Sequence, residues 1–115
     1  MKILLVDDER ELVSTLAERL ELRGIDVHWF TTGEAALKSS ENMPYDLAVL
    51  DVKMPRIGGL ELQRRLKDMH PSMKFIFLTG HGSEDDYLAG TAEGHLYLIK
   101  PVDIEQLIEK IKEIL

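Results

Sequence analysis

Residues 3–8 read ILLVDD, a short unbroken apolar run that ends in two carboxylates. The arrangement recurs along the chain, where residues 47–51 read LAVLD, residues 75–79 read FIFLT and residues 96–100 read LYLIK. Apolar runs of this length indicate strands that are buried on both faces, as in a parallel sheet. Each run therefore delivers a charged or reactive side chain to the carboxyl end of a predicted strand.

These side chains are expected to meet at one edge of the sheet. Ligands of open α/β sheets bind beyond the carboxyl ends of the strands, at the point where the strand order reverses. The polar residues at the four strand ends are Asp7, Asp8, Asp51, Thr79 and Lys100. Three carboxylates, a hydroxyl and an ammonium together describe a site for Mg²⁺ and a phosphoryl group.

Length and charge narrow the class of protein. A chain of 115 residues predicts one domain, 1–115, and its net charge of −7 argues against direct binding of nucleic acid or of an anionic membrane. The absence of cysteine excludes disulfides and thiolate metal sites. No apolar stretch approaches the ~20 residues of a membrane span, and the first strand begins too early to leave room for a signal peptide. We therefore expect a cytoplasmic protein.

Helical patterns alternate with the apolar runs. A strand is expected over Ile25–Phe30. A helix is expected over Ser83–Ala92, although Gly90 inside it disfavours helix formation. Five β-α repeats with right-handed crossovers predict a three-layer α/β/α sandwich. The expected helices cover Arg10–Arg23 before a stop at Gly24, a segment opened by the Thr31–Glu34 cap, a segment from Gly58 to His70, Ser83–Ala92, and a last segment capped by Asp103.

The motifs at the strand ends resemble those of a known family. Residues 6–9 read VDDE, Asp51 is followed by VKMP and then by Gly59, Thr79 precedes a glycine, and residues 97–101 read YLIKP. In this order and spacing they resemble the receiver domain of bacterial two-component response regulators, over essentially the whole chain. The resemblance implies a CheY-like, flavodoxin-like (βα)5 fold with a five-stranded parallel sheet in the order 2-1-3-4-5. The first and third strands would then be neighbours, which brings their acids together at the switch point.

The resemblance also implies a role for each residue of the site. Mg²⁺ would be the cofactor, and the Lys100–Pro101 peptide bond would be cis. By resemblance, Asp51 is the phospho-acceptor. The metal ligands would be Asp8, Asp51 and the backbone carbonyl of Lys53, with Asp7 binding through a water. Lys100 would hold a phosphoryl oxygen, and Thr79 and Tyr97 would form the switch.

The function implied by the resemblance is a phosphorylation-activated signalling switch. A histidine kinase or phosphotransfer protein would donate the phosphoryl group, and the surface of the fourth helix, fifth strand and fifth helix would change. The domain would assist its own aspartyl phosphorylation and dephosphorylation without being an enzyme in the usual sense. A homodimer that depends on phosphorylation is compatible with this reading, whereas the output domain or partner is not readable from these residues.

Two other classes of function compete with this one. A pseudo-receiver would act as a docking module without phosphorylation, although such a module has no need of five polar site residues. A flavodoxin-like FMN protein needs a phosphate loop after the first strand, and none is present there. At the level of single residues, an Asp-Asp pair after a strand commonly caps a helix, and Glu9 is read in that way, as an acid of the first helical turn.

Overall fold

The computed structural model describes residues 1–80 and 96–115. The helix expected over 83–92 lies outside the described residues. The described elements are β1 (Lys2–Val6), α1 (Arg10–Glu21), β2 (Asp26–Phe30), α2 (Gly33–Asn42), β3 (Leu47–Asp51), α3 (Gly59–Met69), β4 (Lys74–Thr79), β5 (Leu96–Ile99) and α5 (Ile104–Ile114).

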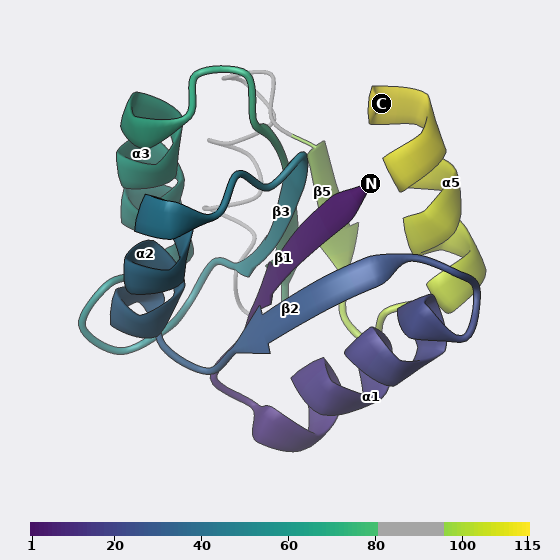
Figure 1. Cartoon of the computed structure of the whole chain (residues 1–115). Coiled ribbons are helices and arrows are strands. Elements are labelled where there is room, and N and C mark those ends of the chain that lie inside the picture. The colour runs from purple at the N-terminus through teal and green to yellow at the C-terminus, as the bar shows by residue number, and fades with distance from the viewer. Residues whose placement is uncertain (81–95) are drawn as a thin grey trace.

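The sheet has the predicted strand order. Its five strands run in the order β2-β1-β3-β4-β5, and every neighbouring pair is parallel. Helices α1 and α5 cover one face of the sheet, and α2 and α3 cover the other (Figure 1). The prediction of a three-layer α/β/α sandwich is therefore confirmed.

Alternate residues of each central strand enter different cores. In β1, Ile3 and Leu5 pack on the side of α1 and α5, whereas Leu4 and Val6 pack on the side of α2 and α3. All four side chains are fully buried. This alternation follows from the period of two in a strand, and it explains why a strand covered on both faces is apolar at every position.

Local capping signals set where the helices begin. The Thr32 side chain accepts a hydrogen bond from the Ala35 N–H at 3.2 Å, and Asp103 caps α5 in the same way. Thr32 is thus the N-cap of α2. The N-cap is Thr32 rather than Thr31, so Glu34 stands one position too early to complete the expected capping box and binds Arg56 Nη1 at 3.1 Å.

Helix α1 ends earlier than predicted. Its last residue is Glu21, and residues 22–24 form a turn that ends at Gly24, with a φ of +82°. The predicted stop at Gly24 is confirmed, because a left-handed backbone conformation cannot continue the helix.

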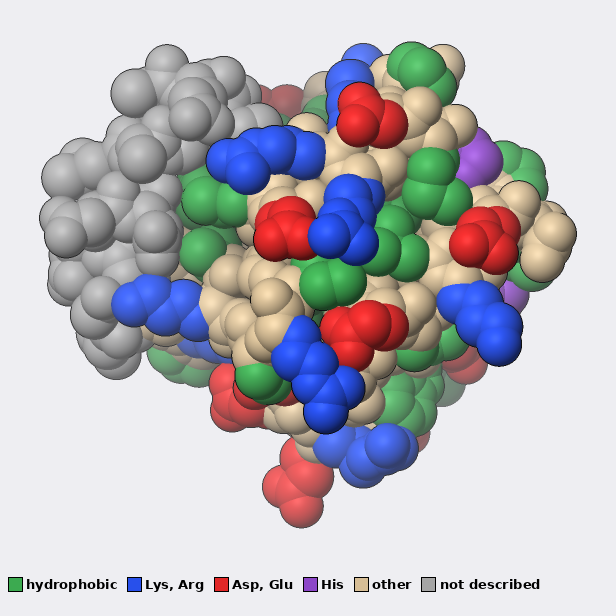
Figure 2. All heavy atoms as spheres, turned by 90° about the vertical axis from the view of Figure 1, so that its left-hand side faces the viewer, with side chains coloured by type: hydrophobic (Ala, Val, Ile, Leu, Met, Phe, Trp, Pro, Cys, Tyr) green, Lys and Arg blue, Asp and Glu red, His purple; other side chains and the backbone are tan. Residues whose placement is uncertain are grey.

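Surface charges of both signs are interspersed on the α2–α3 side of the molecule (Figure 2). Ion pairs there include Arg56 with Glu34 and, within α3, Arg65 with Glu61. Within the two described ranges, no helix has the length and apolar character needed to cross a membrane.

Substitutions at Gly24 should test its left-handed conformation. No described atom lies within 4 Å of an added Cβ, so Gly24→Ala should lose about 1 kcal/mol of unfolding free energy through the backbone alone. Gly24→Asn should lose less, because Asn adopts this conformation more readily. Urea denaturation of both variants measures the difference, and equal losses would contradict the argument.

Candidate functional site

Four strand ends bring the predicted site residues to one edge of the sheet. Asp7 follows β1, Asp51 ends β3, Thr79 ends β4 and Lys100 follows β5. The strand register aligns these ends, since Val6 pairs with Leu50, Asp51 with Leu78 and Thr79 with Ile99. The carboxyl ends of β1 and β3 are neighbours, as the switch-point argument requires.

Three carboxylates form the centre of this edge. One oxygen from each of Asp7, Asp8 and Asp51 can be chosen so that all three lie within 4.8 Å of one another. The Asp7 and Asp51 residues are 0% and 4% exposed, whereas Asp8 is exposed. The cluster is therefore anchored in the core and open to solvent on the side of Asp8.

Lys100 is the cation that faces the cluster. Its Nζ lies 2.8 Å from Asp7 Oδ2, 3.0 Å from Glu9 Oε1 and 3.3 Å from Asp51 Oδ1. Its backbone N–H donates to the Thr79 carbonyl at 2.7 Å, which ties the end of β5 to the end of β4. The Lys100–Pro101 peptide bond is cis, as predicted.

Glu9 belongs to this site, which the sequence did not reveal. It occupies the N-cap position of α1, but its side chain makes no capping hydrogen bond. The carboxylate instead accepts a hydrogen bond from Lys100 Nζ. An acid directly after Asp8 was a visible signal, but its contact with a lysine 91 positions along the chain depends on the fold.

Burial and crowded charge change the pKa values at the site. Burial, followed by the negative charge of Asp7, raises the pKa of Asp51 to about 7 from 3.8. Burial also raises the pKa of Asp7. Burial alone would lower the pKa of Lys100, but the surrounding carboxylates outweigh it and raise that pKa. Burial is thus the main cause of the raised pKa values of the two carboxyl groups, and Lys100 opposes it only in part.

The residues present fit a magnesium ion. Asp7 Oδ2 is buried and accepts no hydrogen bond from the described residues, although Lys100 Nζ lies 2.8 Å away at ion-pair distance. A buried carboxylate oxygen normally accepts a hydrogen bond, and a water bound to a metal ion would supply the donor here. Mg²⁺ prefers carboxylate, carbonyl and water oxygens, and the three acids offer the first of these.

The two predicted switch residues lie on neighbouring strands. Thr79 is 2% exposed and stands two positions after Phe77, so their side chains share one face of β4. The Tyr97 ring of β5 stacks on the Phe77 ring at a centroid distance of 5.1 Å. Lys53, whose carbonyl was predicted to bind metal, lies two residues after Asp51 in the adjoining loop and is exposed.

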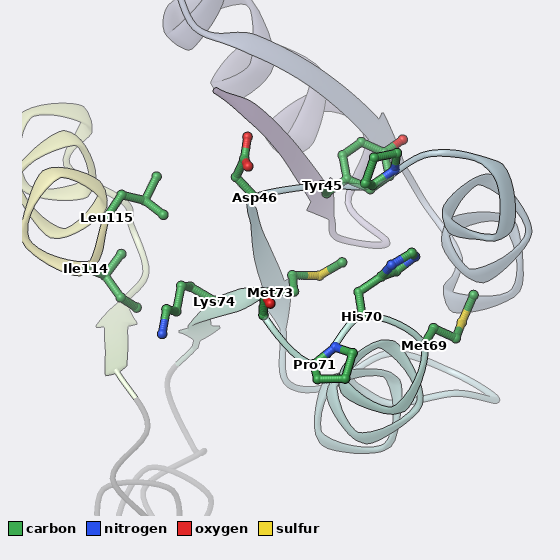
Figure 3. A pocket seen from close by; sticks show the side chains of 11 residues that line it. Tyr45, Asp46, Met69, His70, Pro71, Met73, Lys74, Ile114 and Leu115 are labelled. Atoms are coloured by element: carbon green, nitrogen blue, oxygen red, sulfur yellow. The ribbon is translucent and has the colours of Figure 1, made fainter.

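A cavity of about 480 Å³ lies away from the acids (Figure 3). Its walls include Tyr45 just before β3, Lys74 at the start of β4, and Ile114 and Leu115 at the end of α5. These residues stand at the amino ends of the strands, so the cavity and the acidic cluster occupy opposite edges of the sheet.

The sheet order and the acidic cluster together define a class of protein. A parallel sheet in the order 2-1-3-4-5, with buried acids at its switch point, defines a flavodoxin-like α/β protein with an acidic cluster where such folds bind ligands. Residues 3–112 match the family described as the response regulator receiver domain. The chain belongs to this family, the receiver domains of two-component response regulators.

Individual relatives agree with the family assignment. The chain is 42% identical to the transcriptional regulatory protein CpxR of Escherichia coli K12, over 99% of this chain and 49% of CpxR. It also resembles a CheY-like receiver domain structure from Methanospirillum hungatei, with 34% identity, a TM-score of 0.87, and coverage of 97% of this chain and 90% of that one.

A third relative bears on the site. A response regulator structure from Burkholderia pseudomallei, described as having a phosphorylated aspartic acid, a calcium ion and citrate, is 29% identical with a TM-score of 0.82. The match covers 93% of this chain and 64% of that one. The chain spans about half the length of the curated relatives that it matches first.

The raised pKa of Asp51 predicts how stability depends on pH without metal. Folded Asp51 keeps its proton up to about pH 7, whereas unfolded Asp51 releases it near 3.8. The free energy of unfolding should therefore fall as pH rises from about 4 to about 7, by up to ~1.4 kcal/mol per pH unit. Urea unfolding in EDTA measures this slope, and added Mg²⁺ should reduce it.

The control variants isolate Asp51 in this pH experiment. Asp51→Asn should flatten the slope, because an amide does not titrate in this range. Asp68→Asn removes an exposed carboxylate from α3 and should keep the wild-type slope. Identical slopes for wild type and Asp51→Asn would show that Asp51 is not the group responsible.

Gly59 should be required because α3 begins directly against Asp51. An added Cβ at Gly59 would overlap the Asp51 carbonyl oxygen, whereas one at Gly58 would lie 3.3 Å from the Val52 carbonyl oxygen. Gly59→Ala should cost about 1–3 kcal/mol of unfolding free energy, and Gly58→Ala less. Chemical denaturation compares the two variants, and a Gly59→Ala protein as stable as Gly58→Ala would refute this contact.

Proposed function

We propose that this receiver domain is a phosphorylation-activated switch that accepts a phosphoryl group on Asp51 from a histidine kinase or phosphotransfer protein. The observation that carries the proposal is the Asp51 carboxylate at the end of β3, with Lys100 Nζ 3.3 Å from Oδ1 and with Asp7 and Asp8 beside it. Residues 1–115 would form one such domain.

The chemistry is a transfer to a carboxylate. An Asp51 oxygen attacks the phosphorus, the bond from phosphorus to the donor's leaving group breaks, and the leaving group departs with the electron pair. The product is an acyl phosphate, a recognised form of covalent catalysis. The domain contributes to this one modification of itself and does not turn over a free substrate.

The ionised form of Asp51 is the nucleophile. Burial and Asp7 work against it by raising its pKa to about 7, whereas Lys100 works in its favour. Mg²⁺, when bound, would neutralise charge on Asp51 and on the phosphoryl oxygens. The residues that would hold the ion are Asp8, Asp51, the Lys53 carbonyl and, through a water, Asp7.

The readout would start from Thr79 and Lys100. Lys100 would bind one phosphoryl oxygen, and Thr79 would donate its hydroxyl to another. Thr79 and Phe77 share a face of β4, and Tyr97 packs on Phe77. A shift of Thr79 would therefore displace Tyr97 through this packing. A local charge event of this kind can bias a two-state element, here the surface of the fourth helix, β5 and α5.

The relatives support this proposal in two ways. The Burkholderia structure is described as carrying a phosphorylated aspartic acid and a calcium ion, which matches the pairing of acceptor and cation proposed for this chain. CpxR is called a transcriptional regulatory protein and is about twice as long as the matched region. An output domain that follows a receiver in a longer protein is therefore part of the proposal, with no direct binding of nucleic acid by this domain.

Acetyl phosphate with Mg²⁺ should add one phosphoryl group, on Asp51. Intact mass spectrometry measures the addition and peptide mapping locates it. Asp51→Asn should abolish the modification, because an amide is a poor nucleophile and a poor ligand. The exposed Asp68→Asn control should react like wild type. A mass increase that survives in Asp51→Asn would refute the assignment, and no modification of wild type would favour a docking module.

A further inference from the structure

Glu9 stands at the start of α1 but does not cap the helix. Its backbone is extended, with φ −84° and ψ 95°, and its side chain accepts no hydrogen bond from the first turn. N-cap side chains commonly accept such a bond. The Glu9 N–H donates to Asp7 Oδ1 at 2.9 Å, and Glu9 Oε1 accepts from Lys100 Nζ at 3.0 Å. The Glu9 carboxylate therefore binds Lys100 and does not cap the helix.

Lys100 is surrounded by carboxylates in the unmodified protein. Asp7, Glu9 and Asp51 each place an oxygen within 3.3 Å of its Nζ. Lys100 Nζ donates a hydrogen bond to Glu9 and lies at ion-pair distance from Asp7 and Asp51, so a phosphoryl oxygen on Asp51 would compete with Glu9 for the ammonium.

Of the two carboxylates around Lys100 that are not themselves modified, Glu9 is the one that can release the ammonium at less cost. The Asp7 side chain is 0% exposed, so releasing Lys100 would leave a buried charge without its cation. The Glu9 side chain is 62% exposed, so its carboxylate returns to water readily.

We infer that Glu9 restrains phosphorylation: its carboxylate holds Lys100 in the unmodified protein and must release it before the ammonium binds the phosphoryl group. Glu9 is a positioning residue, since it contacts Lys100 and not the reacting atoms. Its negative charge at the mouth of the site also repels anionic phosphodonors, which acts in the same direction. This inference rests on the proposed function of Asp51.

The test compares Glu9→Gln with a matched control. Gln keeps the length of the side chain and removes its charge. Glu11→Gln makes the same change in the first turn of α1, at an exposed residue that is not among the three carboxylates around Lys100. Initial rates of Asp51 modification by acetyl phosphate are measured by intact mass at one saturating Mg²⁺ concentration, for wild type and both variants.

Glu9→Gln should react about two- to five-fold faster than wild type, which is the range expected for an exposed ion pair. Glu11→Gln should keep the wild-type rate. The difference should shrink in high salt, because exposed charges are screened. The NMR signal of the Lys100 ammonium in the unmodified protein should shift in Glu9→Gln and not in Glu11→Gln, which reports the positioning directly.

Three other outcomes would contradict the restraint by Glu9, its action through Lys100, or the proposed function itself. A Glu9→Gln rate equal to or below that of Glu11→Gln would overturn the restraint. A faster rate with an unchanged Lys100 signal would mean that Glu9 acts on the donor alone, and would overturn its action through Lys100. A wild-type protein that is not modified on Asp51 would instead refute the proposed function, and this inference with it.

Discussion

The rest of the site depends on two buried carboxylates that face one lysine. Asp7 and Asp51 end neighbouring strands of a sheet covered on both faces, so the fold withdraws both from water. Lys100 lies against both, but its charge does not outweigh the cost of burial, so the pKa values of the two acids are raised. The unmodified domain therefore carries an electrostatic strain that a divalent cation would relieve. Such a site can hold additional negative charge only when an additional cation binds.

The packing around the site keeps these charges in place. Gly59 lets the start of α3 approach the carbonyl of Asp51 more closely than any side chain would allow. On the other side, the hydrogen bond from the Lys100 N–H to the Thr79 carbonyl joins the ends of β4 and β5. Asp51, Lys100 and Thr79 are thus held by backbone contacts rather than by flexible side chains. A structural shift at one of these positions would displace the others, because close-packed interiors transmit small shifts.

Much of the fold and most of the site could be predicted from local patterns. Apolar runs such as Ile3–Val6 predict strands covered on both faces, and the caps at Thr32 and Asp103 predict where two helices begin. Boundaries were less certain, as α1 shows by ending at Glu21 instead of Arg23. Helix ends depend on a few weak hydrogen bonds, whereas strand burial is repeated over several residues and is therefore easier to read.

By itself, the sequence determined which polar side chains stand at the strand ends, because the apolar run of a strand buried on both faces stops at or next to the last residue of the strand. The family pattern added the strand order that makes β1 and β3 neighbours, and the structure shows this order. Only the tertiary structure decided how the charges are shared. The local sequence predicts that Glu9 is an acid of the first helical turn, yet its side chain binds Lys100, 91 positions away. The choice between capping a helix and binding a lysine depends on distances across the fold, and no local pattern records them.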